Sequence, residues 1–458
     1  MIKCNQILLI LLLTLLISFC SKQMQEKAVV ASIGDRQITA DEFIHAYEFS
    51  SRQITQLGKE KAFDIILDGL IKESLFADEA RERGLLSNSF IENSVNYFER
   101  AAINRELYLH HVRDSVFVND KEIRNAYQKS NTTIFLKHFI TTNKNDAEKI
   151  SKGIISVPHT PLLNNGNNIN IEGIGEVEKI SFNEVNQNLE NIIYSLPLLQ
   201  FSKPYYDGKI YHVLRVIDKD INVMTTESKF VSKKPSLESV IRKRKEHHAA
   251  SQFVNRIMKP QNLIIKAKTL NWMAEIINDE YKGASNPQYL KSKEVQELYE
   301  KREGAISKEL GIYKSGILTV EDFIEIYRMN PIEISYKDKF SIRKSLENIV
   351  AIYVRNRVFS DIGIHENLDR EQSVIDEKEF WEERLLANEL KKNIFENIKS
   401  QDIDSVEVQK KYNQKIEDLV QELKDQTNID INKKALMAVK TSDYGLSRKI
   451  DFFAKHLQ

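Results

Sequence analysis

Two histidines, His138 and His212, stand in short apolar runs that have the length and composition of β-strands. Imidazoles on neighbouring strands can hold a hydrogen-bond network, because each ring has two nitrogens that can donate or accept. The alternative is that both are core residues whose ring N–H groups bond the backbone. The choice between these interpretations depends on the elements that position the two side chains.

Other kinds of chemistry have less support in the sequence. The pairs His110-His111 and His247-His248 fall on expected helices, where adjacent side chains point about 100° apart, so we expect surface residues and no metal site. The two cysteines, Cys4 and Cys20, border the N-terminal apolar run, so the rest of the chain has neither a cysteine nucleophile nor a disulfide. Phosphate-loop, Gly-x-Ser-x-Gly and His-Glu-x-x-His motifs do not occur, and we expect no cofactor.

The N-terminus predicts export. Residues 7–19 form an apolar run that follows Lys3, and this run is shorter than the roughly 17–25 residues of a membrane span. We therefore expect a signal peptide over residues 1–19. The stretch Ile17-Ser18-Phe19-Cys20 resembles a bacterial lipobox, which implies lipidation of Cys20, although Phe19 stands where a small residue is usual. An uncleaved short anchor and ordinary cleavage are the alternatives, and each places the remainder outside the cytoplasm. With lipidation, we expect a membrane-anchored lipoprotein that faces the periplasm.

Composition favours a mainly helical protein. The 458 residues include only 15 glycines and 8 prolines, and 29% are charged. Because 66 basic residues balance 66 acidic ones, a nucleic-acid partner is not expected. The basic run Arg242-Lys243-Arg244-Lys245 is expected to be a solvated helix face, or alternatively a contact with anionic lipid headgroups.

One pattern occurs twice in the chain. Its first element is a threonine-led amphipathic helix, seen as Ile38-Thr39-x-x-x-Phe43 and again as Leu318-Thr319-x-x-x-Phe323. Glu42, three residues after Thr39, predicts a capping box. Further along, both copies contain a Gly-aliphatic pair, an aromatic-rich helix and a similar ending; these are Gly84-Leu85 and Gly363-Ile364, Phe98 and Phe380, and residues 262–266 and 428–432. Only the first copy carries an extra segment, which we interpret as a separately folded insert.

This pattern predicts a domain order. After the signal peptide we expect a helical region, the insert, a linker with the closing helix and strand of the first copy, a charged helical bridge, the second copy and a tail; the boundaries are 20–135, 136–218, 219–268, 269–310, 311–436 and 437–458. The bridge is expected to be solvated. The strand at 263–265 is expected to pair with the strand at 29–33, so that the two ends of the first copy meet.

The order of these elements resembles the SurA/PrsA/PpiD group of bacterial extracytoplasmic chaperones. The resemblance implies a mainly α fold with a small α+β insert, in which a duplicated helical unit like the SurA N-domain is interrupted in its first copy by a parvulin-type peptidyl-prolyl isomerase domain. It gives His138 and His212 the places of the family's paired active-site histidines. It gives Val185, Leu189 and Ile174 the places of residues that bind substrate.

Three departures from the family pattern imply a degenerate isomerase. Leu189 stands at the place of the family's pocket phenylalanine and Val185 at that of its methionine, and no Asp or Cys lies between Asp146 and Asp207. Prolyl isomerisation must cross a barrier of about 18–20 kcal/mol, and it requires an apolar pocket rather than a nucleophile. Loss of the aromatic ring would remove about 1–2 kcal/mol of differential binding.

We therefore expect a membrane-tethered chaperone or foldase whose two helical units form an apolar groove for unfolded or nascent exported proteins, with outer-membrane proteins as one candidate class. The insert is expected to have weak or no isomerase activity. The alternatives are an active peptidyl-prolyl cis-trans isomerase and a lipoprotein scaffold for one dedicated partner.

Overall fold

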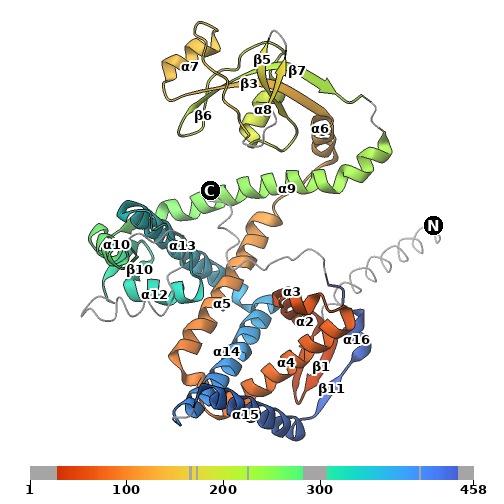
Figure 1. Ribbon diagram of the computed structural model, residues 1–458, viewed down its shortest axis with the longest axis vertical. Coiled ribbons are helices and arrows are strands. Elements are labelled where there is room, and N and C mark those ends of the chain that lie inside the picture. The colour runs from red at the N-terminus through yellow and green to blue at the C-terminus, as the bar shows by residue number, and fades with distance from the viewer. Residues whose placement is uncertain are drawn as a thin grey trace, which may run out of the picture. The chain divides into compact units, whose positions relative to one another are not determined.

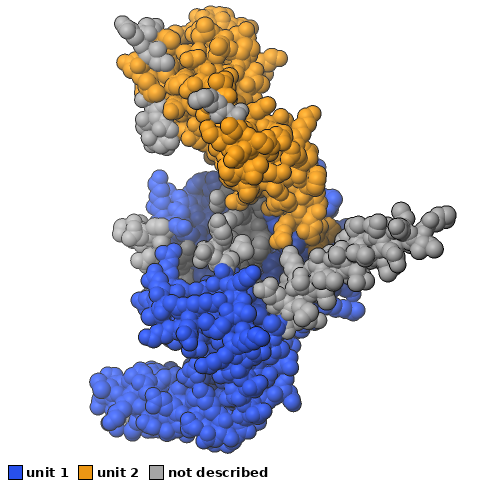
Figure 2. Space-filling model, turned by 90° about the vertical axis from the view of Figure 1, so that its right-hand side faces the viewer, with its two compact units in different colours: residues 1–109, 256–458 blue, residues 110–255 orange. Residues whose placement is uncertain are grey.

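The computed structural model describes residues 28–163, 168–171, 174–223, 226–281, 307–401 and 404–441. The chain divides into two compact units, a helical unit of residues 1–109 and 256–458 and an insert unit of residues 110–255 (Figure 1; Figure 2). The expected signal peptide and Cys20 lie outside the described residues, as do residues 282–306 of the expected bridge and 442–458 of the tail. None of the helices within the described ranges has the length and apolar character of a membrane span.

Each copy of the repeat opens with a β-hairpin followed by a helix. In the first copy these are β1 (Val29–Ile33), β2 (Arg36–Thr39) and α2 (Ala40–Phe49), and in the second β9 (Glu309–Tyr313), β10 (Gly316–Thr319) and α12 (Val320–Met329). Both helices begin after a threonine, Thr39 or Thr319. The hydroxyl of this threonine accepts a hydrogen bond from the backbone N–H of the residue three positions later in the chain. Phe43 and Phe323 are fully buried. The two passages therefore fold alike, as their sequences predict.

The capping box predicted for the first copy is only half formed. The Glu42 carboxylate accepts a hydrogen bond from Arg36 at 2.7 Å instead of returning to the N–H of Thr39. In the second copy the capping box is complete, because the shorter side chain of Asp322 accepts a hydrogen bond from the N–H of Thr319 at 2.8 Å. Burial raises the pKa of Glu42 to about 7, against the opposing effect of Arg36.

The expected pairing of 29–33 with 263–265 is wrong, because the closing strands are exchanged between the copies. The first strand, β1, pairs antiparallel with β11 (Ile429–Ile431) from the end of the second copy. The closing strand of the first copy, β8 (Ile264–Ile265), pairs instead with β9. Two three-stranded sheets result, ordered β11-β1-β2 and β10-β9-β8. Both endings have the same short isoleucine pattern, so either could add to either hairpin edge, and the sequence does not distinguish the two pairings.

The long helices follow the same exchange. The first copy supplies α4 (Lys59–Glu82) and α5 (Ser89–Tyr108), and the second supplies α13 (Lys339–His365) and α14 (Gln372–Lys399). α4 packs along α14, while α13 packs along α5. The buried apolar side chains of α4 from Phe63 to Leu75 form one core cluster with Phe43 of the first copy and with Phe380 and Leu436 of the second. Phe98 and Trp381, one from each copy, stack with ring centroids 3.8 Å apart.

Shorter elements complete the helical unit. They are α3 (Arg52–Thr55), η1 (Leu85–Ser87), η3 (Lys259–Gln261), α10 (Ala267–Tyr281), η4 (Leu368–Arg370), α15 (Ser405–Gln426) and α16 (Lys433–Ala438). The segment expected to begin a solvated bridge is α10, which instead packs on α13 and β9. Leu270 and Met273 on its inner face are buried. The high charge of the following residues hid this apolar stripe in the sequence.

The insert unit is built around a five-stranded antiparallel sheet. Its elements are η2 (Leu109–Arg113), α6 (Asp120–Ser130), β3 (Thr132–Thr141), α7 (Lys144–Ser151), β4 (Asn168–Ile171), β5 (Gly175–Ile180), α8 (Gln187–Ser195), β6 (Tyr205–Tyr206), β7 (Tyr211–Ile221) and α9 (Glu227–Met258). The strand order is β4-β5-β3-β7-β6. One face packs Leu136 and Leu214 against α8, and the other packs Phe139 and Val213 against α7. This alternation positions the histidines, because His138 and His212 occupy the α8 face of β3 and β7.

Candidate functional site

The structure brings His138 and His212 together. His138 on β3 pairs with Leu214 on β7, which places His212 diagonally across from it. The Nε2 atom of His138 lies 2.9 Å from Nδ1 of His212, and the two rings are nearly parallel with centroids 5.1 Å apart. Their exposed fractions are 2% and 7%. The pair is therefore a hydrogen-bonded unit closed off from solvent.

The partners of the two rings fix where their protons lie. His138 Nδ1 is 2.6 Å from the carbonyl oxygen of Thr160, which can only accept, so this nitrogen carries the hydrogen. Burial lowers the pKa of His138 to about 4, which leaves its Nε2 without a proton at neutral pH, able to accept from His212 Nδ1–H.

The far nitrogen of His212 faces a carboxylate. Its Nε2 lies 3.1 Å from Oδ2 of Asp207. The N–H of Ile210, His212 and the N–H of Lys209 hold the pKa of Asp207 well below its usual range, so this carboxylate is ionised. His138, His212 and Asp207 therefore form one continuous row of polar side chains that ends in a charged carboxylate.

Sequence reasoning missed both of these partners, Asp207 and Thr160, and also the carboxylate of Glu178, which holds the loop of Thr160. Asp207 supplies the acid that seemed absent, and it lies in the turn before β7 rather than after the first helix. Thr160 lies in a loop whose backbone N–H groups, from Leu162 and Leu163, donate to the fully buried carboxylate of Glu178 at 2.7 and 2.6 Å. Glu178 stands in an alternating strand pattern that predicts an outward-facing charge, so the sequence gives no signal of this role.

The three predicted substrate-binding residues differ in how exposed they are. Leu189 is 3% exposed and belongs, with the partly buried Val185, to the core cluster between the sheet and α8. Ile174 lies outside that cluster, is 39% exposed, and its carbonyl oxygen accepts a hydrogen bond from Lys137. The residues expected to receive a prolyl ring are thus mainly core. Of these three residues, only Ile174 has a largely exposed side chain that could contact a substrate.

The histidine pair predicts a pH-dependent stability. Because the pKa of His138 falls from its usual 6.5 to about 4 on folding, the unfolded chain binds more protons between these values, and stability is lost as pH falls through that window. From pH 7 to pH 5 this group should cost about 2 kcal/mol. Urea unfolding of the wild type and of His138→Gln at both pH values checks this. A variant as pH-sensitive as the wild type would contradict it.

Arg244 and Lys245 of the basic run on α9, and His111 of the paired helical histidines, make contacts within the insert unit that were not expected. Arg244 donates to both carboxylate oxygens of the buried Glu190 at 2.9 and 2.7 Å, and Lys245 pairs with Glu122 at 2.6 Å. The expectation of a solvated face therefore fails for these two residues. Likewise His111 stacks on Phe253, although His110, His247 and His248 are exposed as predicted.

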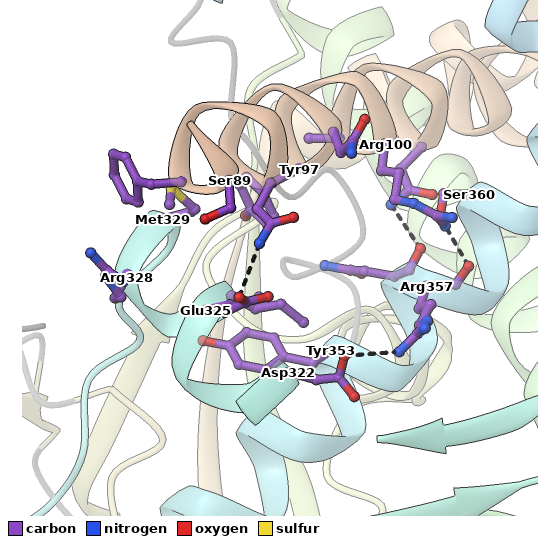
Figure 3. Close-up of a pocket in the computed structure, with 17 residues that line it drawn as sticks. Ser89, Tyr97, Arg100, Asp322, Glu325, Arg328, Met329, Tyr353, Arg357 and Ser360 are labelled. Carbon is purple, nitrogen blue, oxygen red and sulfur yellow. Dashed lines mark hydrogen bonds and ion pairs between the residues drawn. The ribbon is translucent and has the colours of Figure 1, made fainter. Parts of the chain in front are cut away.

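A second candidate site lies in the helical unit, in a cleft between α5 of the first copy and α12 and α13 of the second (Figure 3). Its volume is about 380 Å³, within the usual range for ligand sites. The lining combines aromatic rings, amides, cations and carboxylates: Phe90, Tyr97, Tyr353, Asn93, Asn96, Asn104, Asn356, Arg100, Arg328, Arg357, Asp322 and Glu325. Sequence reasoning expected a groove but not these residues, because the cleft exists only through the exchange of helices between copies.

Comparisons with known proteins give structural matches only. No protein-family model and no curated protein sequence matches the chain. Among solved structures, the peptidyl-prolyl isomerase PrsA from Bacillus anthracis is 13% identical, with 41% of this chain and 96% of that one covered and a TM-score of 0.21. A SurA-like chaperone of Campylobacter jejuni is 12% identical, with 52% and 100% covered and a TM-score of 0.23. PrsA from Bacillus subtilis is 15% identical, with 54% and 97% covered and a TM-score of 0.16. Because these TM-scores are low, the function of this chain must be inferred from its own residues.

Proposed function

We propose that the protein is an extracytoplasmic chaperone or foldase that binds unfolded exported proteins and is tethered to the membrane through a lipid on Cys20. The observation that supports binding is the cleft between the exchanged copies, where aromatic rings and asparagine amides share one lining. The tether rests on the sequence around Cys20 alone. It predicts that Cys20→Ser moves the protein from the membrane fraction to the soluble fraction.

The cleft lining suits polypeptide segments of varied sequence. Asparagine amides both donate and accept, so they can bond the backbone of any extended segment. The rings of Phe90 and Tyr97 offer apolar contact to aliphatic or aromatic side chains. A disordered segment loses conformational entropy when it binds, so such binding is weak and tolerant of sequence. These are the properties that a general chaperone requires.

The proposed function predicts suppression of aggregation. Residues 21–458 at a one-to-one ratio should keep an unfolded outer-membrane protein soluble, as measured by light scattering after dilution from urea. Tyr97→Ala should weaken this effect several-fold by removing apolar surface from the cleft. Phe340→Ala, at an exposed aromatic residue on α13 that does not line the cleft, is the matched control. No suppression at a stoichiometric excess would refute the proposal.

A second candidate function, prolyl isomerisation, is supported by the intact contact between His138 and His212. We infer that this activity is weak or absent, because Leu189 is core and Val185 lies beside it. In a protease-coupled peptide assay the rate should stay within about tenfold of the uncatalysed reaction, and His138→Ala should not change it. A fast rate that His138→Ala abolishes would establish an active isomerase instead.

A further inference from the structure

We propose that the cleft between α5, α12 and α13 binds an extended peptide segment that carries a carboxylate side chain, with this carboxylate beside Arg100 and Arg357. The proposal rests on the chaperone function above and names the kind of segment that the chaperone prefers. Figure 3 shows how the cleft is polarised: Arg328 and Met329 lie near one end, and Arg100, Ser360 and Arg357 lie near the other.

The cleft has the length of a short peptide. α5 lines it with residues three or four positions apart, from Ser89 through Tyr97 to Asn104. At 1.5 Å per residue these positions span about 22 Å. An extended chain covers that distance with roughly six or seven residues. A segment lying along α5 would therefore contact both ends at once.

The charges of the cleft favour an anionic group at one end. Three arginines line it against two carboxylates, Asp322 and Glu325. Arg357 pairs only loosely with Asp322, at 3.5 Å, and Arg100 uses one terminal nitrogen to bond both Ser360 and Asp361. Both arginine side chains are about 40% exposed and have N–H groups left to donate to a carboxylate. Burial, Glu321 and Asp322 raise the pKa of Glu325, which lies close enough to Arg328 to interact with it. A further anion is therefore disfavoured at the Arg328 end, and the Arg100 end is the place for it.

An unpartnered acceptor lies beside this end. Asn104 is 9% exposed, and its Nδ2 donates to the carbonyl oxygen of Asn356 at 3.0 Å. Its Oδ1 atom is buried and has no hydrogen-bond partner among the described residues. A buried acceptor left unpaired costs free energy, and a peptide N–H would satisfy it. Asn104 is one helical turn from Arg100, so one peptide residue can donate its N–H to Asn104 while a neighbouring carboxylate reaches Arg100.

The test uses three fluorescein-labelled seven-residue peptides with blocked termini, which differ only at a central Leu-Glu-Tyr, Leu-Gln-Tyr or Leu-Lys-Tyr. Fluorescence anisotropy with residues 21–458 should show the Glu peptide binding about tenfold more tightly than the Lys peptide. Arg100→Gln and Arg357→Gln should each remove most of this preference. Arg343→Gln, an equally exposed arginine on α13 that pairs with Glu347 away from the cleft, should keep it.

The outcomes separate this proposal from the chaperone function. Equal affinity for the three peptides, or an equal loss in Arg343→Gln, overturns the carboxylate site. If the protein still suppresses aggregation in that case, the chaperone function stands and only the peptide preference is wrong. Asn104→Leu provides a second measurement, because it should weaken all three peptides alike through the lost N–H bond. An unchanged affinity in this variant overturns the backbone contact.

Discussion

Leu436→Ala should strip hydrogen-exchange protection from β1 and β2 while leaving that of β9 and β10 nearly unchanged. Leu436 stands near the C-terminus on α16, is 1% exposed, and packs in one cluster with Val30 and Phe43 of the first hairpin. Truncating a buried leucine costs about 2–5 kcal/mol of folding free energy. The loss of stability should be greatest in the elements that the leucine contacts. A residue at the end of the second copy is thus expected to stabilise the beginning of the first.

Leu270→Ala is the matched control for this prediction. Leu270 is also 1% exposed, and its helix α10 follows the closing strand of the first copy but packs against β9 and α13 of the second. Its truncation should therefore release β9 and β10 and spare β1 and β2. If each closing segment packed against the hairpin of its own copy, Leu436→Ala would release β9 and β10, and Leu270→Ala would release β1 and β2.

A crosslink tests the same exchange without relying on stability. Ser32 lies opposite Asp430 in the register of β1 and β11. Cysteines at these two positions should form a disulfide under mild oxidation, because paired strand positions are close enough to bridge. Cysteines at Ser32 and Ile264 should not, since Ile264 pairs with Ile312.

The sequence predicts the local structure of the repeat but not its partners. The threonine caps, the buried Phe43 and Phe323 and the apolar stripe of α4 all depend on residues within one turn or two of each other. The exchange depends on a choice between two equivalent hairpin edges, and local pattern carries no information on that choice. For the same reason the cleft, whose lining comes from α5 of one copy and α12 and α13 of the other, could not be assembled from the sequence.

The histidine site shows a similar division. The contact between His138 and His212 follows from two adjacent strands and the family resemblance, and the structure has it. The resemblance places an acid after the first helix of the insert, whereas the structure supplies the carboxylate of Asp207 to His212 from the turn before β7. Leu189 was expected on a pocket wall, but its smaller side chain packs into the core.

One pair of glycines was matched wrongly between the copies. Gly84 ends α4 with φ +73° and is followed by the turn η1. The equivalent residue in the second copy is Asn367, with φ +62°, followed by η4. Asparagine tolerates the left-handed conformation better than most residues, so it replaces glycine there. Gly363, four residues earlier, lies inside α13 and must have a different reason to be glycine.

That reason gives the second prediction, that Gly363→Val destabilises the helical unit by about 3 kcal/mol. A Cβ atom at Gly363 would lie 2.3 Å from Cγ2 of Ile103, a buried β-branched side chain on α5 that cannot swing aside. The helices α5 and α13 would have to move apart, and the cleft that they line would change shape. Urea unfolding should show the loss directly.

Gly69→Ala provides the control for Gly363, because it shares the backbone effect without the clash. Gly69 lies inside α4, and a Cβ atom there would meet nothing within 4 Å. Alanine should therefore stabilise by about 0.5–1 kcal/mol through helix propensity. Gly363→Ala gains the same helix propensity, but the clash with Ile103 should still make the protein less stable overall. Ile103→Ala should cost less free energy of unfolding in the Gly363→Ala background than in the wild type, because it removes the clash. If Gly363→Ala stabilised the protein as Gly69→Ala does, the helix crossing at Ile103 would be looser than the structure requires.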